Sequence, residues 1–176
     1  MKAVGLSILL CACLVITGCR STSKLEVVTD FEADRYLGVW YEAARMPHRF
    51  EKNLSSVSAA YSFNEDGTIK VLNRGFNDKK LQWEEIEGVA KFKADSEQGW
   101  LKVSFFKPFY ASYKIIHLNS TYTEAIVTGP SYGYLWILVR DPSLAEADVN
   151  KLIAKADDFG FDTENLIIVD QSRNPL

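Results

Sequence analysis

Few side chains in this sequence combine a type and a spacing that could support catalysis. The 176 residues contain two histidines, His48 and His117, and acid–base chemistry near neutral pH usually depends on histidine. The sequence has no Gly-x-Ser-x-Gly run, no glycine-rich phosphate loop and no His/Cys/carboxylate cluster with metal-ligand spacing. His117 is expected at the rim or the surface. The sequence therefore predicts a protein that is not an enzyme and that holds no metal and no cofactor.

Cys19 is the residue with the clearest chemical role. It ends an apolar run that begins at Ala3, behind the basic Lys2, and this run is shorter than the ~20 residues of a transmembrane helix. The residues Val15-Ile16-Thr17-Gly18-Cys19 resemble a bacterial lipobox, in which the leader is cut before the cysteine and the cysteine is acylated. An ordinary secretory signal that contains cysteine is the alternative. The other cysteines, Cys11 and Cys13, would leave with the leader, so no internal disulfide is expected.

The chain divides into three parts on this reasoning. Residues 1–18 are expected to form a lipoprotein signal peptide, 19–30 the lipidated N-terminus and a tether, and 31–176 one folded domain. The tether could reach roughly 30 Å if it were fully extended. Several acyl chains, at ~0.8 kcal/mol per buried CH₂, would hold such a protein on a membrane permanently. Arg20 follows the cysteine, and resemblance to sorted lipoproteins then implies the outer membrane of a Gram-negative bacterium, facing the periplasm.

Composition indicates an all-β domain and argues against nucleic acid as a partner. The net charge is -3, and no run of Lys or Arg is longer than two residues. The chain is rich in aromatic residues, with 8 Tyr, 10 Phe and 4 Trp, and these favour strands together with Val, Ile and Thr. Strand-like runs alternate with short turn signals. We expect strands over 39–46, 55–63, 68–76, 82–94, 100–106, 111–118, 122–128 and 133–140.

The connections between these runs are too short for crossover helices, so neighbouring strands must be antiparallel. Eight such strands joined in order can close into an up-and-down barrel, which leaves no exposed edges. A two-layer sandwich is the competing architecture. Trp40 and Tyr41 are adjacent in the first strand, so one ring must face inward while the other is covered from outside or lies at a rim.

One helix and one short strand are expected after the barrel. Ser143 and Glu146 have the spacing of a capping box, and Gly160 has the position of a helix terminator. Between them, apolar residues recur at helical spacing and would pack on the outside of the barrel: Val149, Leu152, Ile153, Ala156 and Phe159. The run 166–169 would add a ninth strand beside the first.

The inward face of the run 82–94 bears on whether the barrel is hollow. Its apolar face consists of Ile86, Gly88, Ala90, Phe92 and Ala94, of which three are small. This missing volume suggests an interior that is not completely filled. The alternative is that large side chains opposite fill the gap. An eight-stranded barrel can do either, and a hollow one holds a small ligand.

Two distant segments resemble the lipocalin family. Gly38-x-Trp40-Tyr41-Glu42 and Arg140 at the end of the eighth strand resemble its signature, and the stretch 31–169 follows its order of elements. Arg45-x-Pro47-His48-Arg49-Phe50-Glu51 and Tyr134-Leu135-Trp136-Ile137-Leu138, with the lipobox, resemble the bacterial outer-membrane lipoproteins of the family and its apolipoprotein D-like members. The segment Tyr122-Thr123-Glu124-Ala125 departs from the family's middle motif, which affects the expected loop packing near the closed end.

The resemblance implies roles for particular residues. The arginine that matches Arg140 lies across the tryptophan that matches Trp40 and plugs one end of the barrel, so Gly38, Trp40 and Arg140 are expected to be structural. A guanidinium over an indole contributes ~0.5–2 kcal/mol. Trp136 is expected to line the cavity, with Leu138 on the same strand face. Further candidates for ligand contact are Tyr113, Phe105 and Phe92.

The function implied is that of a membrane-anchored binding protein for a fatty acid or lysophospholipid, with a role in envelope maintenance or stress. A polar headgroup at the open end would meet His48, Arg49 and Lys52, unless these residues only form a solvated loop. A lipid-modifying enzyme on the same scaffold and a filled barrel that serves as an anchored interaction surface are the alternatives. The sequence leaves both a monomer and a homodimer as alternatives.

Overall fold

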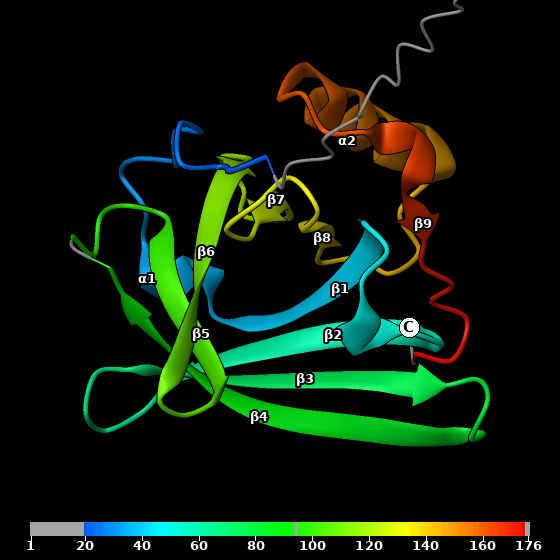
Figure 1. Cartoon of the computed structure of the whole chain (residues 1–176), viewed down its shortest axis with the longest axis horizontal. Helices are drawn as coiled ribbons and strands as arrows, with labels where there is room; N and C mark the ends of the chain where they lie inside the picture. The colour runs from blue at the N-terminus through cyan, green and yellow to red at the C-terminus, as the bar shows by residue number, and fades with distance from the viewer. Residues whose placement is uncertain (1–19, 94, 175–176) are drawn as a thin grey trace, which may run out of the picture.

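The chain forms a closed antiparallel barrel of eight strands (Figure 1). The computed structural model describes residues 20–93 and 95–174, so the predicted leader, Cys19 and Ala94 lie outside the described residues. Each strand pairs with the next, and β8 pairs with β1. This closure confirms the barrel and excludes the sandwich. The strands are β1 (Gly38–Arg45), β2 (Leu54–Phe63), β3 (Ile69–Asn77), β4 (Gln82–Phe92), β5 (Trp100–Phe106), β6 (Phe109–Leu118), β7 (Glu124–Thr128) and β8 (Leu135–Val139).

Alternation along β1 divides its side chains between the interior and the outside. Trp40 is completely buried and pairs with Ala59, and both belong to the hydrophobic cluster inside the barrel. Tyr41 points the other way and packs with the cluster between the barrel and the C-terminal helix. Because directly paired residues share a face, the register carries this inward face around the sheet.

The expected strand ends are close to the observed ones, with two informative differences. Strand β6 begins at Phe109, before the expected 111, because the turn that precedes it is short. Strand β7 begins only at Glu124. The Asn119 side chain accepts hydrogen bonds from the backbone amides of Thr123 (2.8 Å) and Glu124 (3.2 Å), and Tyr122 has a φ of 57°. These contacts hold 119–123 in a turn instead of a strand.

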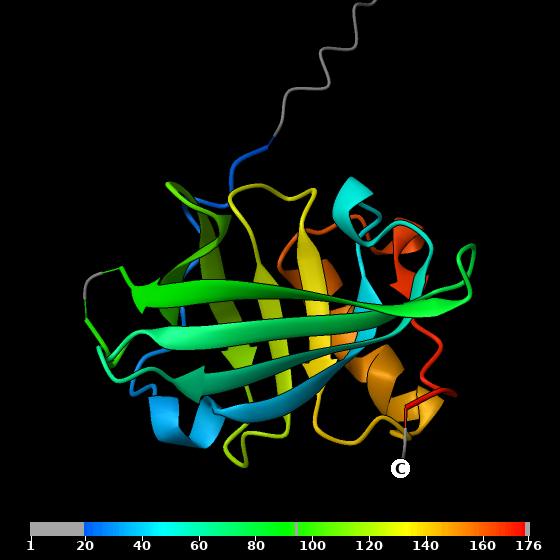
Figure 2. The same ribbon diagram turned by 90° about the horizontal axis from the view of Figure 1, so that it is seen from below.

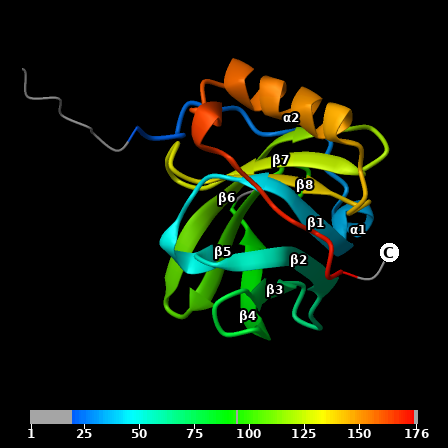
Figure 3. The ribbon, with the colours of Figure 1, turned by 90° about the vertical axis from the view of Figure 1, so that its right-hand side faces the viewer.

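Helix α2 (Glu146–Asp158) packs on the outside of the barrel (Figure 3). Its buried stripe contains Val149, Leu152 and Ala156, as the spacing predicted, and Gly160 follows its end with a φ of 84°. The capping box was a wrong prediction. The N-cap residue is Ala145, without a side-chain cap, because the Ser143 hydroxyl instead donates to Asp141 Oδ1 at 2.7 Å.

A ninth strand beside the first is confirmed. After the short 3-10 helix η2 (Thr163–Asn165), β9 (Ile167–Ile168) pairs antiparallel with the end of β1.

Residues 20–28 form an N-terminal strap that lies along the outside of the barrel. Ser21 bridges Ser131, the buried Thr22 hydroxyl donates to the carbonyl of Gly129 at 2.6 Å, and the Val28 amide donates to the carbonyl of Ile115 at 2.9 Å. The Lys114 ammonium group also donates to three strap carbonyls. The expected extended tether is therefore wrong for this stretch, which is held by hydrogen bonds to distant residues.

The barrel has two different ends (Figure 2). One end, here called the mouth, carries the connections β1–β2, β3–β4, β5–β6 and β7–β8, and the first of these contains the short 3-10 helix η1 (Arg49–Glu51). The other, the closed end, carries the remaining turns and helix α1 (Ala33–Tyr36), which leads into β1. The described chain starts at the mouth and passes along the strap to α1 at the closed end.

Candidate functional site: the barrel interior

Arg140 closes the barrel beneath Trp40. Its guanidinium carbon lies 4.0 Å from the centroid of the indole ring, and the indole Nε1 donates to the carbonyl of Tyr36 at 2.8 Å. The arginine donors reach five backbone carbonyls, those of Arg35, Tyr36, Leu37, Val39 and Tyr122. The arginine therefore ties α1, the start of β1 and the β6–β7 turn together.

Gly38 fits beside this arginine because it has no side chain. Its φ is 92°, and a Cβ atom there would lie 3.2 Å from Arg140 Nη1. A larger residue would be strained in this backbone conformation and would crowd the guanidinium.

Three tyrosines form a floor across the interior. The hydroxyl of Tyr113 is 2.8 Å from that of Tyr36 and 2.9 Å from that of Tyr61. Burial raises the pKa of all three hydroxyls, that of Tyr61 to about 12. The tyrosine floor is therefore a neutral, hydrogen-bonded layer at any physiological pH.

Below the floor, the barrel is filled. The space that remains there is ≈ 10 Å³, about the room for one water molecule. Phe92 packs in this half against Phe31, with ring centroids 6.4 Å apart. Nearer the mouth on β4, a Cβ atom at Gly88 would lie 2.7 Å from the ring of Phe105. The interpretation of the small residues of β4 as empty space is therefore wrong at Gly88, because a large side chain from the neighbouring strand covers it.

Above the floor, inward-facing apolar side chains are partly accessible to solvent on the side of the mouth. Ile86 pairs with Asn73 on the inward face, yet it is 39 % exposed, so solvent reaches this half of the interior. Trp136 and Phe105 are half-buried there, and Leu138 is buried next to Glu42 on the paired strand. The five candidate lining residues thus separate: Trp136, Phe105 and Leu138 lie above the floor, Tyr113 within it and Phe92 below it.

A buried polar cluster lies on one wall of the open half, and it consists of Glu42, Arg45, His48 and Glu51. Arg45 Nη1 is 3.2 Å from Glu42 Oε2, and its Nε is 3.4 Å from Glu51 Oε2. Glu51 Oε2 also accepts a hydrogen bond from Trp136 Nε1 at 3.2 Å and lies 3.0 Å from His48 Nε2. Arg45 Nη2 donates to the carbonyls of Glu51 and Leu54. Trp136 is therefore oriented by the cluster.

The pKa values of the two carboxyl groups in the cluster are shifted in opposite directions. Burial raises the pKa of Glu42 well above its ordinary value, and the nearby negative charge of Glu51 adds to this effect. Burial also raises the pKa of Glu51, but His48, Arg45 and the Trp136 hydrogen bond together lower it below its ordinary value. Burial thus favours the protonated form of Glu42, whereas the partners of Glu51 favour its ionised form. Arg45 contacts both carboxyl groups.

Sequence reasoning missed this cluster. Glu42 lies two residues after the inward-facing Trp40, so alternation alone places a carboxyl group inside the barrel. His48 was expected at the open end, to meet a headgroup or to form part of a solvated loop. Its side chain is instead 5 % exposed and packs against Trp136, with ring centroids 5.3 Å apart. Arg49 and Lys52 are exposed at the mouth, as expected.

The other histidine is not part of this site. His117 is half-buried, and its pKa is lowered by burial and by the positive charge of Lys155 on helix α2. Residues 20–93 and 95–174 contain no group of three or more His, Cys, Asp or Glu side chains that could hold a metal ion. In the same described part of the chain, no helix has the length and apolar character needed to cross a bilayer.

An eight-stranded barrel that is sealed at one end by an arginine under a tryptophan, open at the other, and flanked by one helix defines a lipocalin-type protein. The family described as "Lipocalin-like domain" matches residues 31–171, and the chain belongs to this family. Among its relatives, the outer membrane lipoprotein Blc of Vibrio cholerae is 45% identical over 173 residues, which cover 97% of this chain and 99% of the relative.

More distant relatives are also similar over most of this chain. Apolipoprotein D of Mus musculus is 29% identical, over 85% of this chain and 82% of its own. The solved structure of insecticyanin from Manduca sexta is 19% identical, and it superimposes with a TM-score of 0.67 over 83% of this chain and 84% of its own. This last likeness supports the fold.

Proposed function

We propose that this protein is a membrane-anchored lipid-binding protein that holds the acyl chain of a fatty acid or lysophospholipid above the tyrosine floor. The observation that carries the proposal is the open half of the barrel, where Trp136 and Phe105 present apolar surface that solvent reaches. Apolar surface of this kind is stabilised when a ligand covers it. Relatives named outer membrane lipoproteins support the outer membrane of a Gram-negative cell as the location, with Cys19 as the acylated residue.

The charges of the interior favour an orientation with the acyl chain inward. Arg45 is paired within the polar cluster and Arg140 is bound to backbone carbonyls, so neither guanidinium is free for an anionic headgroup. Exposed basic residues, among them Arg49 and Lys52, lie instead at the mouth. The headgroup would therefore remain at the mouth while CH₂ groups enter the barrel.

The depth of the open half limits the affinity. Each CH₂ that enters contributes ~0.8 kcal/mol, and the tyrosine floor prevents the chain from reaching the closed end. Costs of association and ordering offset part of this gain, which gives an expected dissociation constant of about a micromolar. A role in envelope maintenance or stress is proposed from the binding of fatty acids or lysophospholipids and from the outer-membrane location.

The test is a titration of rigorously delipidated protein with lysophospholipid, followed by tryptophan fluorescence. Trp136→Ala should weaken binding by about tenfold or more, because it removes apolar wall from the open half. Trp40→Ala should chiefly lower the melting temperature, since Trp40 lies under Arg140 and away from the mouth. The proposal fails if the parent protein shows no saturable response, if both variants behave alike, or if a product forms from the lipid.

A further inference from the structure

Apart from Ile168 on β9, the most exposed apolar side chains gather at the mouth. Phe109 is 78 % exposed, Leu81 73 %, Phe106 66 % and Phe50 61 %. Phe106 ends β5 and Phe109 begins β6, whereas Leu81 lies in the β3–β4 connection and Phe50 in η1 of the β1–β2 connection. All four therefore lie at this end of the barrel. Leaving so many large apolar groups in water is unfavourable, and their concentration at one end indicates a surface that something covers.

The mouth connections are also basic, although the whole chain is acidic. They carry five basic residues against the two acidic residues Asp78 and Glu51, in a chain of net charge -3, and Glu51 is buried in the polar cluster. The basic residues are Arg49, Lys52, Lys79, Lys80 and Lys107. Of these, Lys80 is paired with Glu84. Apolar side chains interleaved with basic ones suit an anionic lipid surface, where apolar groups insert and cations meet headgroups.

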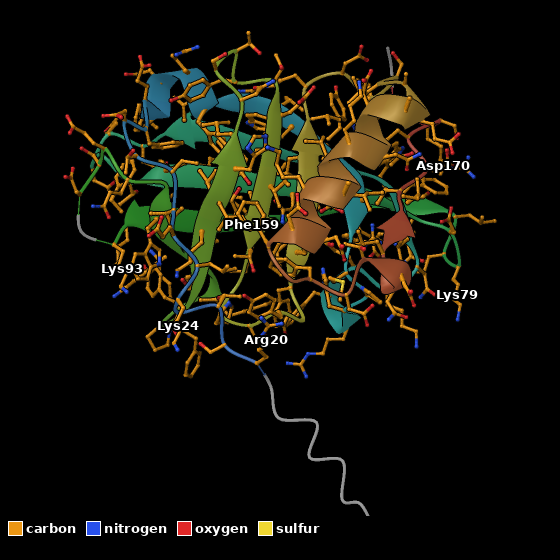
Figure 4. All side chains as sticks on the ribbon, turned by 90° about the horizontal axis from the view of Figure 1, so that it is seen from above. Arg20, Lys24, Lys79, Lys93, Phe159 and Asp170 are labelled. Atoms are coloured by element: carbon orange, nitrogen blue, oxygen red, sulfur yellow. The ribbon has the colours of Figure 1, made fainter. Side chains whose placement is uncertain are left out.

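The start of the described chain is fixed at the same end. The Tyr132 amide donates to the carbonyl of Arg20 at 2.9 Å, the Arg20 guanidinium lies 4.0 Å from the ring centroid of Tyr132, and Ser21 bridges Ser131. All of these partners belong to the β7–β8 connection. Figure 2 shows the start of the described chain beside this connection and η1, opposite α1, and Figure 4 labels Arg20 and the exposed Lys24 at this edge.

We propose that the mouth rim, defined as Phe50, Leu81, Phe106 and Phe109 with the basic residues between them, docks on the anionic bilayer that anchors the protein. The inference rests on the proposed function through acylation of Cys19. Because the next residue is held at the mouth, an acylated Cys19 leaves no long tether that would let the barrel turn its mouth away. The ligand then passes between bilayer and barrel without crossing water.

The orientation can be measured with single thiol labels. In the acylated protein the Cys19 sulfur is blocked and Cys11 and Cys13 are removed with the leader, so an introduced cysteine is the one reactive thiol. Full-length Phe109→Cys and Leu81→Cys proteins, purified from membranes, carry an environment-sensitive dye at the rim. Phe63→Cys, at the end of β2 on the closed end and 45 % exposed, is the matched control. Each is placed in vesicles of phosphatidylethanolamine and phosphatidylglycerol that contain a nitroxide-labelled lipid.

The dyes at Phe109 and Leu81 should shift to shorter wavelength and be quenched by the labelled lipid, whereas the dye at Phe63 should not. Equal spectra at all three positions, or quenching at Phe63 alone, would overturn the proposal. Dye burial that appears without vesicles and increases with protein concentration would assign the rim to a second copy of the chain, and would overturn it too.

A rate measurement tests the consequence for transfer. Transfer of a fluorescent fatty acid from vesicles to the protein should accelerate with vesicle concentration, and Phe109→Asp should slow it about tenfold while Phe63→Asp leaves it unchanged. A rate that is independent of vesicle concentration would contradict direct transfer.

Failure of the docking inference and failure of the proposed function give different results. If the rim dyes enter the bilayer but lysophospholipid does not bind, the docking stands and the proposed function falls. If the ligand binds but the rim dyes stay in water, the reverse holds. The mass of the purified protein reports separately whether Cys19 is acylated.

Discussion

At the residue scale, the closed end depends on one side chain whose shape matters as much as its charge. Arg140 combines contact with the indole of Trp40 and donors to five carbonyls. An ammonium group has three donors and no planar face, so it cannot reproduce this set of contacts.

Arg140→Lys should therefore lower the free energy of unfolding by ~1–3 kcal/mol, because several carbonyls, three of them in part-buried contacts, lose a charged donor. Urea unfolding measures the change. The matched control is Arg74→Lys, since Arg74 also stacks on a tryptophan, Trp83, at 3.9 Å, but is 40% exposed at its side chain. There the cost should be ~0–1 kcal/mol. Equal losses in the two variants would refute the structural role of the carbonyl contacts.

The raised pKa of Glu42 should make stability depend on pH. Its folded pKa is raised above the ordinary value of 4.5, so the stability it contributes is complete below about pH 4.5 and is lost as the pH rises through the raised pKa. Glu42→Gln cannot ionise. Relative to the parent protein, its free energy of unfolding should thus increase as the pH is raised, with little difference at acidic pH.

The pKa of Glu51 is shifted in the opposite direction, so a substitution of Glu51 serves as the control. Its folded pKa is lowered, so its stabilising contribution is present above pH 4.5 and is lost as the pH falls through the lowered pKa. Glu51→Gln should consequently destabilise the protein at neutral pH. If Glu51→Gln instead behaves as described for Glu42→Gln, the raised pKa belongs to Glu51 and not to Glu42. Denaturant titrations across the pH range distinguish these cases.

At the element scale, helix α2 begins without a side-chain cap at Ala145, whose backbone is already non-helical and exposed. Ala145→Ser should supply a hydroxyl acceptor for the first free amides and raise the free energy of unfolding by ~0.5–2 kcal/mol. The control is Ala147→Ser. Ala147 is the second residue of the helix and is also exposed, and serine there should be neutral or slightly destabilising. Thermal unfolding of both variants gives the comparison; a gain at both positions would exclude capping as the cause.

The barrel could be predicted from the sequence because its elements follow from local patterns. Alternation, short turns and aromatic residues determine antiparallel strands, and Gly160 marks the end of α2. The helix start was mispredicted because Asp141 competes for the Ser143 hydroxyl, a local contact that the capping pattern does not include. The strap was mispredicted for another reason, since it is held by Lys114 and the β7–β8 connection, far away in the sequence.

The interior was predictable only in part, because packing inside a barrel joins residues from non-neighbouring strands. Alternation places Trp136 and Leu138 on one strand face, but it does not reveal that Tyr36, Tyr61 and Tyr113 join hydroxyls into a floor. Likewise, the absence of a side chain at Gly88 suggested empty space, whereas the ring of Phe105 occupies it. Inside the barrel, the apolar surface that solvent reaches therefore lies on the mouth side of the tyrosine floor.

At the scale of the whole molecule, attachment and orientation are separate properties. Cys19→Ser should move the protein from the membrane to the soluble fraction after cell lysis, because the rim alone lacks the ~0.8 kcal/mol per CH₂ that buried acyl chains provide. Cys11→Ser and Cys13→Ser, in the predicted leader, should leave the protein in the membrane fraction. Retention of the Cys19→Ser protein would show that acylation at this residue is not the anchor.

The N-terminal strap also determines how the protein would respond to mechanical load. A pull from an anchored first residue would act on Ser21 and Thr22 at the mouth before it reached any barrel strand, since these residues are bonded to the β7–β8 connection. The strap would detach progressively from the mouth towards α1, one contact after another, and lengthen the attachment while the barrel and its contents remain intact. The strap would thus extend under force before any load reached the strands of the barrel.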